Sequence, residues 1–218
     1  MTPDTSPPAQ RLRLRYAKKD HARFVGHLDE ARFWERVFRR VDLPLAYSHG
    51  FNPQPRLQFA AALPVGVCGE QELLDLWLTT RVEPDLWRAR IGQNLPAGFT
   101  IHALEEAALT LPAMQASLRQ AEYQVAGLDP AELETLSQRV AALLAQSALP
   151  RPHHKHPGQT YDLRPLIHEI TPVEGGLRLR LAAGAGGNAR ITEVLAALGL
   201  APAHLHICRT ALIFDEAK

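Results

Sequence analysis

The chain has 218 residues and a mass of 24.1 kDa, a length that suits two domains of about 100 residues each. Hydrophobic residues make up 46% of the chain, enough for packed cores, but no apolar run reaches the length of about 18 residues that spans a membrane. Cys68 and Cys208 are too few for a disulfide scaffold, and the first residues lack the basic and apolar regions of a signal peptide, so we expect a cytoplasmic protein.

Residues 1–10 are expected to form a disordered tail, and a first domain is expected over residues 11–110. Residues 11–17, RLRLRYA, alternate charged and apolar side chains as a half-buried strand does. Residues 28–41 repeat apolar side chains with helical periodicity and carry Asp29 in the first turn. After a loop rich in proline and glycine, the expected elements are two strands over 56–64 and 70–82, a helix over 84–96 and a strand over 99–107.

The second half of the chain repeats this order of elements without repeating its residues. Over residues 120–218 the expected elements are a strand over 121–128, a helix over 131–146, a hairpin turning at Glu174-Gly175-Gly176, a helix over 189–200 and a strand over 204–214. Each half therefore has the order β-α-β-β-α-β, the split βαβ pattern. The predicted fold class is α+β, with two ferredoxin-like domains in tandem.

Positive charge is concentrated in the N-terminal part of the chain. Residues 11–56 contain eleven Lys and Arg against five Asp and Glu. Around the helix expected over 28–41, apolar side chains gather on one face and four arginines on another: Arg32, Arg36, Arg39 and Arg40. Arginine binds phosphate in a bidentate manner, so this face indicates an anionic partner, most simply nucleic acid. A solvated basic helix face is the other interpretation of the same pattern.

A loop rich in proline and glycine, PLAYSHGFNPQPR over residues 44–56, follows this helix. Phe51 is either presented for stacking on a base or packed into the core below the loop. Asn52 either hydrogen-bonds a base edge or caps the turn with its own backbone. Together with Ser48 and Arg56, these residues predict a loop that binds rather than catalyses.

Two histidines, His27 and His49, stand at opposite ends of the arginine-bearing helix and its following turn. Either one would suit a general base that cleaves RNA through the 2′-hydroxyl while the arginines hold the phosphate. The alternative is an ordinary histidine at a helix end or a turn. Because about 20 Å of helix and turn separate them, the two histidines are not expected to meet.

Two further clusters give weaker signals. The run HHKH over residues 153–156 lies in a loop with further basic residues and prolines, and we expect a solvated basic loop there rather than a metal site. The run GAGG over residues 184–187 precedes a helix, where backbone amides can hold phosphate, but it matches no nucleotide-binding fingerprint. No metal site is expected in the chain.

Around the arginine-bearing helix the sequence resembles a known family. The matching elements are Arg23-Phe24, His27-Leu28-Asp29, Arg32, Arg39-Arg40, Leu43-Pro44, Ser48, Gly50-Phe51-Asn52-Pro53, Pro55, Leu63-Pro64, Gly66 and Glu70, and a weaker second motif matches at Tyr161-Asp162-Leu163-Arg164-Pro165. On these residues the chain is identified as a member of the radical-SAM-linked proteins, a domain of unknown function often fused to the C-terminus of a radical-SAM protein. The dense part of the match spans residues 23–78. It departs from the family at Gly26, where a serine is usual, and at Gln54, where histidine is frequent.

The resemblance implies a partner rather than a mechanism. A radical-SAM enzyme would supply an iron–sulfur cluster and S-adenosylmethionine, whereas this chain has no C-x-x-x-C-x-x-C run to hold a cluster. We therefore expect no cofactor in this chain and no catalysis by the chain alone. The order of elements is also similar to that of tandem ferredoxin-like RNA-binding proteins, including the endoribonucleases that process CRISPR repeats, although fold does not carry function.

Three functions follow from these observations. The first is an accessory protein of a radical-SAM enzyme that binds or presents an RNA or ribonucleoprotein substrate. Its site would combine the arginine face with the loop: Asp29, Arg32, Arg36, Arg39, Arg40, Ser48, Phe51, Asn52 and Arg56. The second is a metal-independent endoribonuclease that uses His27 or His49. The third is a protein–protein adaptor that binds no nucleic acid.

Overall fold

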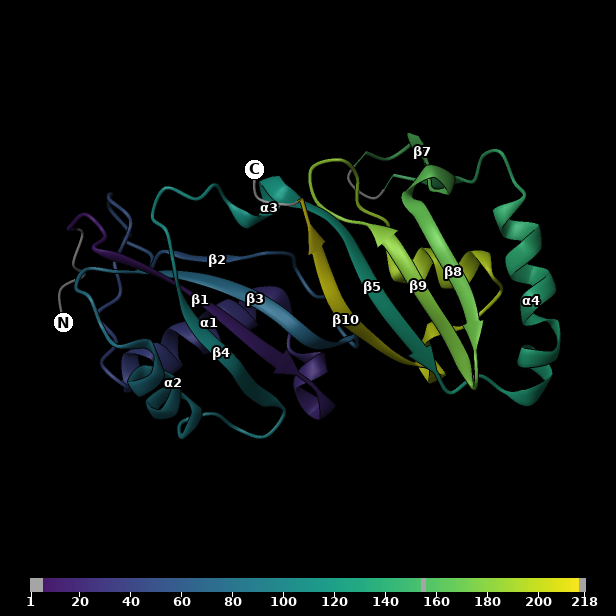
Figure 1. The fold of residues 1–218 in the computed structure, drawn as a ribbon. Coiled ribbons are helices and arrows are strands. Elements are labelled where there is room, and N and C mark those ends of the chain that lie inside the picture. Colours follow the sequence, from purple (N-terminus) through teal and green to yellow (C-terminus); the bar gives the residue numbers. More distant parts are fainter. Residues whose placement is uncertain (1–5, 154–155, 216–218) are drawn as a thin grey trace. The chain divides into compact units, whose positions relative to one another are not determined.

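The computed structural model describes residues 6–153 and 156–215, and Figure 1 shows its elements. Contacts between residues group the chain into two compact units, residues 1–116 and residues 117–218. Each unit combines helices with antiparallel strands, so the chain is a mixed α+β protein. Within the described residues, no helix is long and apolar enough to cross a membrane.

The first unit has the order of elements that its sequence predicts. They are β1 (Gln10–Lys18), α1 (His27–Arg40), β2 (Leu57–Phe59), β3 (Cys68–Leu78), α2 (Pro84–Gly92) and β4 (Phe99–Ala107). Two short elements were not predicted: η1 (Asp20–Phe24), a 3-10 turn that leads from β1 into α1, and α3 (Met114–Ser117), which follows β4. Both are too short to carry a periodic pattern of apolar residues.

The strands of the first unit lie in the order β4-β1-β3-β2, and every neighbouring pair is antiparallel. Along β1 the apolar side chains point into the core and the arginines point to the opposite face, as the alternation predicts. Helices α1 and α2 cover the core face, as Figure 1 shows, and bury Trp34, Val37, Phe38 and Ile91 against the strands.

β2 is shorter than the strand predicted over residues 56–64, since it spans only Leu57–Phe59. The chain then turns through a segment that contains Pro64 and Gly66. Proline offers no N–H to a strand ladder, and Gly66 has a φ of 87°, a left-handed conformation that ends an extended run.

β1 begins at Gln10, the last residue of the segment predicted as a tail. The Gln10 side chain is buried and makes two hydrogen bonds with the backbone of Val82. Its Nε2 donates to the Val82 carbonyl oxygen at 3.1 Å, and its Oε1 accepts the Val82 N–H at 2.9 Å. These contacts fix the Gln10 side chain to the sheet. Hydropathy alone does not predict that such a polar residue belongs to the strand.

A buried ion pair joins α1 to β1. Lys18 Nζ lies 2.7 Å from Glu30 Oε2, and both side chains are almost completely buried. Lys18 Nζ also donates to the Val25 carbonyl oxygen at 2.7 Å, and the Tyr16 hydroxyl donates to Glu30 Oε1 at 2.6 Å. Burying two charges is costly, and these hydrogen bonds offset the cost only while α1 keeps this position against β1.

The second unit also has the predicted order of main elements. They are β5 (Leu118–Ala126), α4 (Pro130–Leu144), β8 (Ile167–Val173), β9 (Gly176–Ala182), α5 (Ile191–Ala197) and β10 (His206–Phe214), with the strands in the order β10-β5-β9-β8 and antiparallel neighbours. The elements that were not predicted are a small hairpin of β6 (Pro150–Pro152) and β7 (Thr160–Asp162) and the 3-10 turns η2 (Arg164–Leu166) and η3 (Pro202–His204). The inward residues of β9 are Leu177, Leu179 and Leu181, all fully buried.

Removing one partner of the buried ion pair should be costly. We expect Lys18→Met to lower the free energy of unfolding of the first unit by about 3–5 kcal/mol, because it leaves the Glu30 carboxylate buried and unpaired. The double variant Lys18→Met/Glu30→Met removes both charges and should cost less than the two single variants together. Because Trp34, Trp77 and Trp87 all lie in the first unit, urea unfolding followed by tryptophan fluorescence measures this unit. Strictly additive costs would contradict a coupled pair.

Candidate functional site

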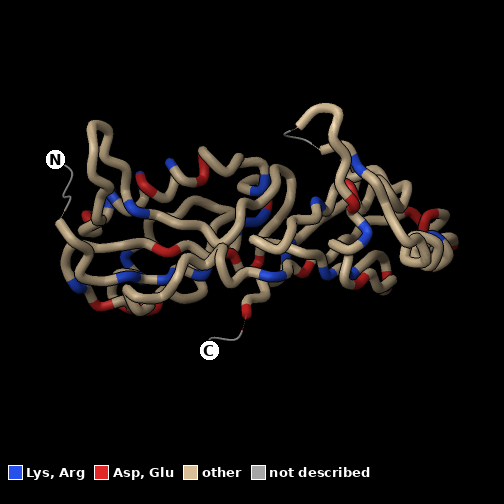
Figure 2. Tube along the Cα trace, turned by 90° about the horizontal axis from the view of Figure 1, so that it is seen from above, with Lys and Arg blue, Asp and Glu red and all other residues tan. Residues whose placement is uncertain are grey.

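Basic and acidic positions are interspersed along the chain, as Figure 2 shows, so an arginine is available to an anion only where no acid compensates it. The four arginines of α1 are exposed, and two of them are compensated within the helix. Arg32 lies 3.3 Å from Asp29 and Arg39 lies 2.8 Å from Glu35. Spacings of three and four residues bring such side chains together on a helix surface. Asp29 and Arg32, both predicted as site residues, therefore contact each other.

Arg36 and Arg40 differ because no described residue forms an ion pair or hydrogen bond with their guanidinium groups. They lie one helical turn apart, about 6 Å along the axis, and both line a hollow of about 650 Å³. The other residues that line this hollow, which we call the arginine hollow, are Phe33, Val37, Gln93, Asn94, Leu95 and Pro96. Two uncompensated charges thus share a concave surface with amide and apolar groups, a combination that suits a phosphate-bearing ligand.

The loop that follows α1 is a small hairpin held by backbone hydrogen bonds. Tyr47 and Pro55 form an isolated β-bridge. The Ser48 N–H donates to the Gln54 carbonyl oxygen at 2.8 Å, and the Gln54 N–H donates to Ser48 Oγ at 3.0 Å. Gly50 has a φ of 124°, which a side chain would strain, so it provides the reversal at the tip. Ser48 therefore closes the hairpin.

The tip of this hairpin exposes His49, Phe51 and Asn52. Phe51 is completely exposed, so the alternative that it packs into the core is wrong. No described residue hydrogen-bonds the Asn52 side chain, so the alternative that it caps the turn is wrong as well. Both side chains are free to contact a ligand, and an exposed aromatic ring can stack on a base.

Arg39 joins the hairpin to the end of α1. Its Nε donates to the Tyr47 hydroxyl at 3.1 Å, and its guanidinium carbon lies 5.8 Å from the centre of the Tyr47 ring. The hydrogen bond with Tyr47 and the nearby Glu35 raise the pKa of Arg39 above its ordinary value. The hairpin therefore starts beside the end of the helix that carries Arg36 and Arg40.

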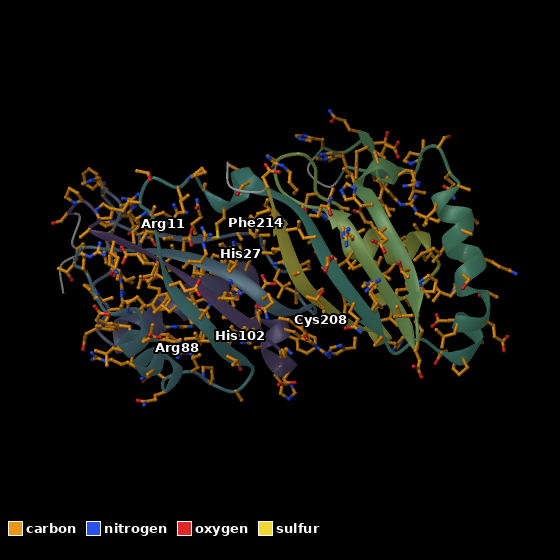
Figure 3. The ribbon with its side chains drawn as sticks, in the orientation of Figure 1. Arg11, His27, Arg88, His102, Cys208 and Phe214 are labelled. Atoms are coloured by element: carbon orange, nitrogen blue, oxygen red, sulfur yellow. The ribbon has the colours of Figure 1, made fainter. Side chains whose placement is uncertain are left out.

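His27 and His49 lie in different surroundings. The His27 ring, labelled in Figure 3, packs edge-on against Phe59 of β2 with the ring centres 5.0 Å apart. Its Nδ1 is buried and has no hydrogen-bond partner among the described residues. His49 is exposed at the tip of the hairpin. No contact joins the two rings in the part of the chain that the structure describes, so they do not form a catalytic pair.

Arg56, at the end of the loop, is separated from the arginines of α1. It lies on the face of the sheet opposite the helices, with its guanidinium carbon 5.3 Å from the centre of the Trp77 ring. Arg11 of β1, labelled in Figure 3, approaches the same ring at 4.8 Å. The structure therefore joins the base of the hairpin to the end of α1 through Arg39, and it places Arg56 in a second location.

Asp75, Trp77 and Gln58 belong to this second location and, like Arg11 and Arg13, were not predicted as site residues. Asp75 accepts hydrogen bonds from Arg11 and Arg13 at 2.5–3.0 Å, and Trp77 lies two residues further along β3. The alternation of LLDLWL over residues 73–78 is a signal that places Asp75 and Trp77 on one face. Gln58, the third, gave no such signal because β2 has only three residues.

The second motif, residues 161–165, has structural contacts in the second unit. Asp162 Oδ1 accepts the Leu149 N–H at 2.7 Å. The Arg164 guanidinium donates to the Leu144 carbonyl oxygen at 2.9 Å and so caps the last turn of α4. These contacts account for the aspartate and the arginine of the motif without a ligand.

The remaining clusters give no sign of a metal or a nucleotide. The His153 and His156 rings lie with their centres 4.6 Å apart, and His154 is outside the described residues. Across residues 6–153 and 156–215, no three His, Cys, Asp or Glu side chains are arranged to hold a metal ion. In the glycine run over 184–187, Gly184 has a φ of 97° and packs directly on the backbone of Leu118, which explains the glycine by close approach.

These observations define an α+β protein whose first unit presents two uncompensated arginines in a hollow and, after the same helix, a hairpin with an exposed aromatic tip. The chain belongs to a family described as uncharacterized protein conserved in bacteria (DUF2344), whose sequence profile matches residues 11–192. Among solved structures, a crystal structure of an unknown protein from Galdieria sulphuraria is similar at 16% identity over 80% of each chain, with a TM-score of 0.30, a likeness too weak to carry an argument. No curated protein matches the sequence.

The hairpin should depend on Ser48 but not on Phe51. We expect Ser48→Ala to lower the free energy of unfolding by about 0.5–1.5 kcal/mol, because the Gln54 N–H loses its acceptor. Amide hydrogen exchange at Gln54 should become faster in that variant. Phe51→Ala should change the free energy of unfolding by less than about 0.5 kcal/mol, since the ring is fully exposed. A large loss of stability in Phe51→Ala would show that the ring packs on the protein.

Tyr161 should ionise later than an ordinary tyrosine. Burial and a hydrogen bond to Glu193 raise the pKa of Tyr161 from 10.0 to about 12. The folded state favours the neutral phenol, so its stabilising effect is complete below pH 10.0 and is lost as the pH rises towards about 12. The tyrosinate absorbance that appears late in an alkaline titration should be smaller in Tyr161→Phe than in the wild type by the contribution of one tyrosine. A titration of all tyrosines near pH 10.0 would contradict the contact.

Proposed function

We propose that this chain is an accessory protein of a radical-SAM enzyme and that it binds and presents an RNA or ribonucleoprotein substrate. The observation that carries the proposal is the pair Arg36 and Arg40, two uncompensated arginines one turn apart in the arginine hollow. Lys and Arg contacts with phosphate provide most of the affinity of proteins for nucleic acids. Two adjacent guanidinium groups with no acid beside them suit neighbouring phosphates of a strand.

The hairpin adds a second kind of contact to these charges. The Phe51 ring can stack on an unpaired base, and the exposed Asn52 amide can hydrogen-bond a base edge. Gln93 and Asn94, which also line the arginine hollow, provide further amide groups for sugar or phosphate oxygens. Phosphate contacts together with base stacking are typical of single-stranded RNA recognition, so we propose unpaired RNA as the substrate class.

The order of strands supports the finer fold assignment that the sequence predicts. In each unit the fourth strand neighbours the first, the first neighbours the third, and the second lies beyond the third. This antiparallel order, with both crossover connections helical, is the one that a split βαβ unit forms. We therefore propose two tandem ferredoxin-like domains. The assignment concerns the fold, and the RNA proposal stands on the arginines.

The radical-SAM partner follows from the family resemblance, and with it the iron–sulfur cluster and S-adenosylmethionine that the partner would carry. We propose that the two proteins meet in the cytoplasm. One feature of the first unit suits a protein contact: Phe24, Leu28 and Val65 are exposed apolar side chains around the start of α1. Val65 lies close to Gly26, the residue before α1: a Cβ atom placed on Gly26 would be 3.9 Å from Val65 Cγ2. An exposed apolar group of this kind is common at protein contacts.

The endoribonuclease alternative has less support in the geometry. His27 stands nine residues before Arg36 on α1, about 14 Å along the axis, so one phosphate cannot contact Arg36 while His27 reaches the adjacent 2′-hydroxyl. The Nδ1 of His27 is also buried, so this nitrogen is not exposed to a ligand on the surface. His49 is accessible, but nothing in the described residues orients its ring as a general base.

RNA binding should depend on salt and on the two free arginines. We expect the full chain to bind a labelled pool of single-stranded RNA with a steep dependence on salt, because each phosphate contact adds about 0.7 to the log–log slope. The double variant Arg36→Glu/Arg40→Glu should bind more weakly and reduce the slope by more than about 1. Fluorescence anisotropy across a salt series measures both quantities.

The matched control is Arg178→Glu, compared with the single variants Arg36→Glu and Arg40→Glu. Arg178 is exposed on β9 of the second unit and has no ion-pair or hydrogen-bond partner among the described residues. The control should leave affinity and slope close to those of the wild type. No RNA binding at moderate salt would sink the proposal in favour of the adaptor. Cleavage that persists in EDTA and disappears in His27→Ala or His49→Ala would establish the endoribonuclease instead.

A further inference from the structure

A further hollow, which we call the sheet hollow, lies on the face of the first unit's sheet opposite α1 and α2. Its volume of about 440 Å³ falls in the range of about 300–1,000 Å³ that is usual for small-molecule sites. One wall is the segment after β4, which contributes Leu109, Leu111 and Ala113. Arg11 fixes this wall, because its guanidinium donates to the carbonyl oxygens of Leu111 at 2.6 Å and Pro112 at 3.2 Å.

The charge that the sheet hollow offers to a ligand belongs to Arg56. Asp75 already accepts hydrogen bonds from Arg11 and Arg13, so it is fully engaged by two arginines. Arg56 lies over Trp77, and no described residue forms an ion pair or a side-chain hydrogen bond with its guanidinium. An exposed guanidinium at the edge of a concave site attracts an anionic group.

Gln58 gives the sheet hollow an amide without partners. Its Oε1 is buried and accepts no hydrogen bond, and within the described residues its Nε2 has no acceptor. Polar atoms buried in this way are nearly always hydrogen-bonded in folded proteins. Gln58 lines the hollow, so turning its amide into the hollow would present both groups to a ligand that has one donor and one acceptor side by side.

We propose that the sheet hollow binds an adenosine phosphate, either as a free nucleotide or as one residue of an RNA strand. The adenine N6 amino group and N7 form the donor–acceptor pair that a glutamine amide recognises in a bidentate manner. The purine ring would pack against the indole of Trp77 and the side chains of Leu109 and Leu111. The phosphate would contact the Arg56 guanidinium.

Adenine fits this combination better than the other bases. Guanine presents two acceptors on the corresponding edge, N7 and O6, and one of them would meet Gln58 Oε1 with no donor between them. A pyrimidine would cover less of the apolar wall formed by Leu109 and Leu111. In its RNA form this inference rests on the proposed function, whereas binding of a free nucleotide does not.

Isothermal titration calorimetry with the full chain tests the assignment. Adenosine 5′-monophosphate is the probe, guanosine and uridine 5′-monophosphate are the base controls, and adenosine is the control without phosphate. We expect Gln58→Leu to weaken the binding of adenosine 5′-monophosphate about tenfold or more. Arg56→Met keeps an apolar stem on Trp77, so it should remove the advantage of the phosphate and leave adenosine binding unchanged. Gln124→Leu, at an exposed position of β5 in the second unit, is the matched control and should bind as the wild type does.

The same variants are then titrated with short oligoadenylate and oligouridylate strands. A preference for oligoadenylate that disappears in Gln58→Leu supports the RNA form, and binding of the mononucleotide without this preference supports the free nucleotide. Absence of any Gln58-dependent and Arg56-dependent binding at millimolar nucleotide overturns the inference, even if RNA still binds through Arg36 and Arg40. Nucleotide binding without RNA binding would leave the inference standing and remove the proposed function. If Gln58→Leu does not fold by tryptophan fluorescence, the comparison of Arg56→Met with the wild type decides.

Discussion

The orientation of α1, and with it the position of the candidate site, depends on the buried pair of Lys18 and Glu30. No side chain caps the first turn of α1, whose N-cap is Gly26, so the helix start is fixed from β1 instead. With Glu30 directed into the core, Arg36 and Arg40 lie about a quarter to a third of a turn away around the helix. That rotation directs them towards the arginine hollow. A helix free to rotate about its axis would not hold two guanidinium groups at a defined place.

Whether an arginine can bind an anion depends on whether an acidic side chain already pairs with it, and not on the total positive charge of the region. The N-terminal part of the chain has a large excess of basic residues, yet Asp29, Glu35 and Asp75 together engage four of its arginines. Five arginines of this region form no ion pair among the described residues, and three of them, Arg36, Arg40 and Arg56, line hollows. An ion pair satisfies both partners and leaves little field outside, whereas an unpaired guanidinium in a concave surface keeps its attraction for an anion.

Periodicity predicted the main elements of both units, because apolar side chains at helical or alternating spacing must be buried together. It also placed Arg36 and Arg40 on one face, since that follows from the helix alone. It could not show that Arg32 and Arg39 are compensated, because side-chain pairing depends on rotamers and neighbours. Nor could it distinguish the exposed Phe51 from a core aromatic, which depends on the direction of the hairpin. The sequence did not indicate that Glu30 is buried, because glutamate is usually exposed and the residue type alone does not distinguish the two cases.

The loop PLAYSHGFNPQPR makes side-chain contacts near both of its ends, and its middle residues are exposed. At its start Tyr47 is hydrogen-bonded to Arg39 at the end of α1, and at its end Arg56 lies over Trp77 on the opposite face of the sheet. The hairpin is therefore held between the end of α1 and the opposite face of the sheet. The prolines restrict the backbone of the segment, so the exposed residues between the two contacts lose little further freedom when they bind.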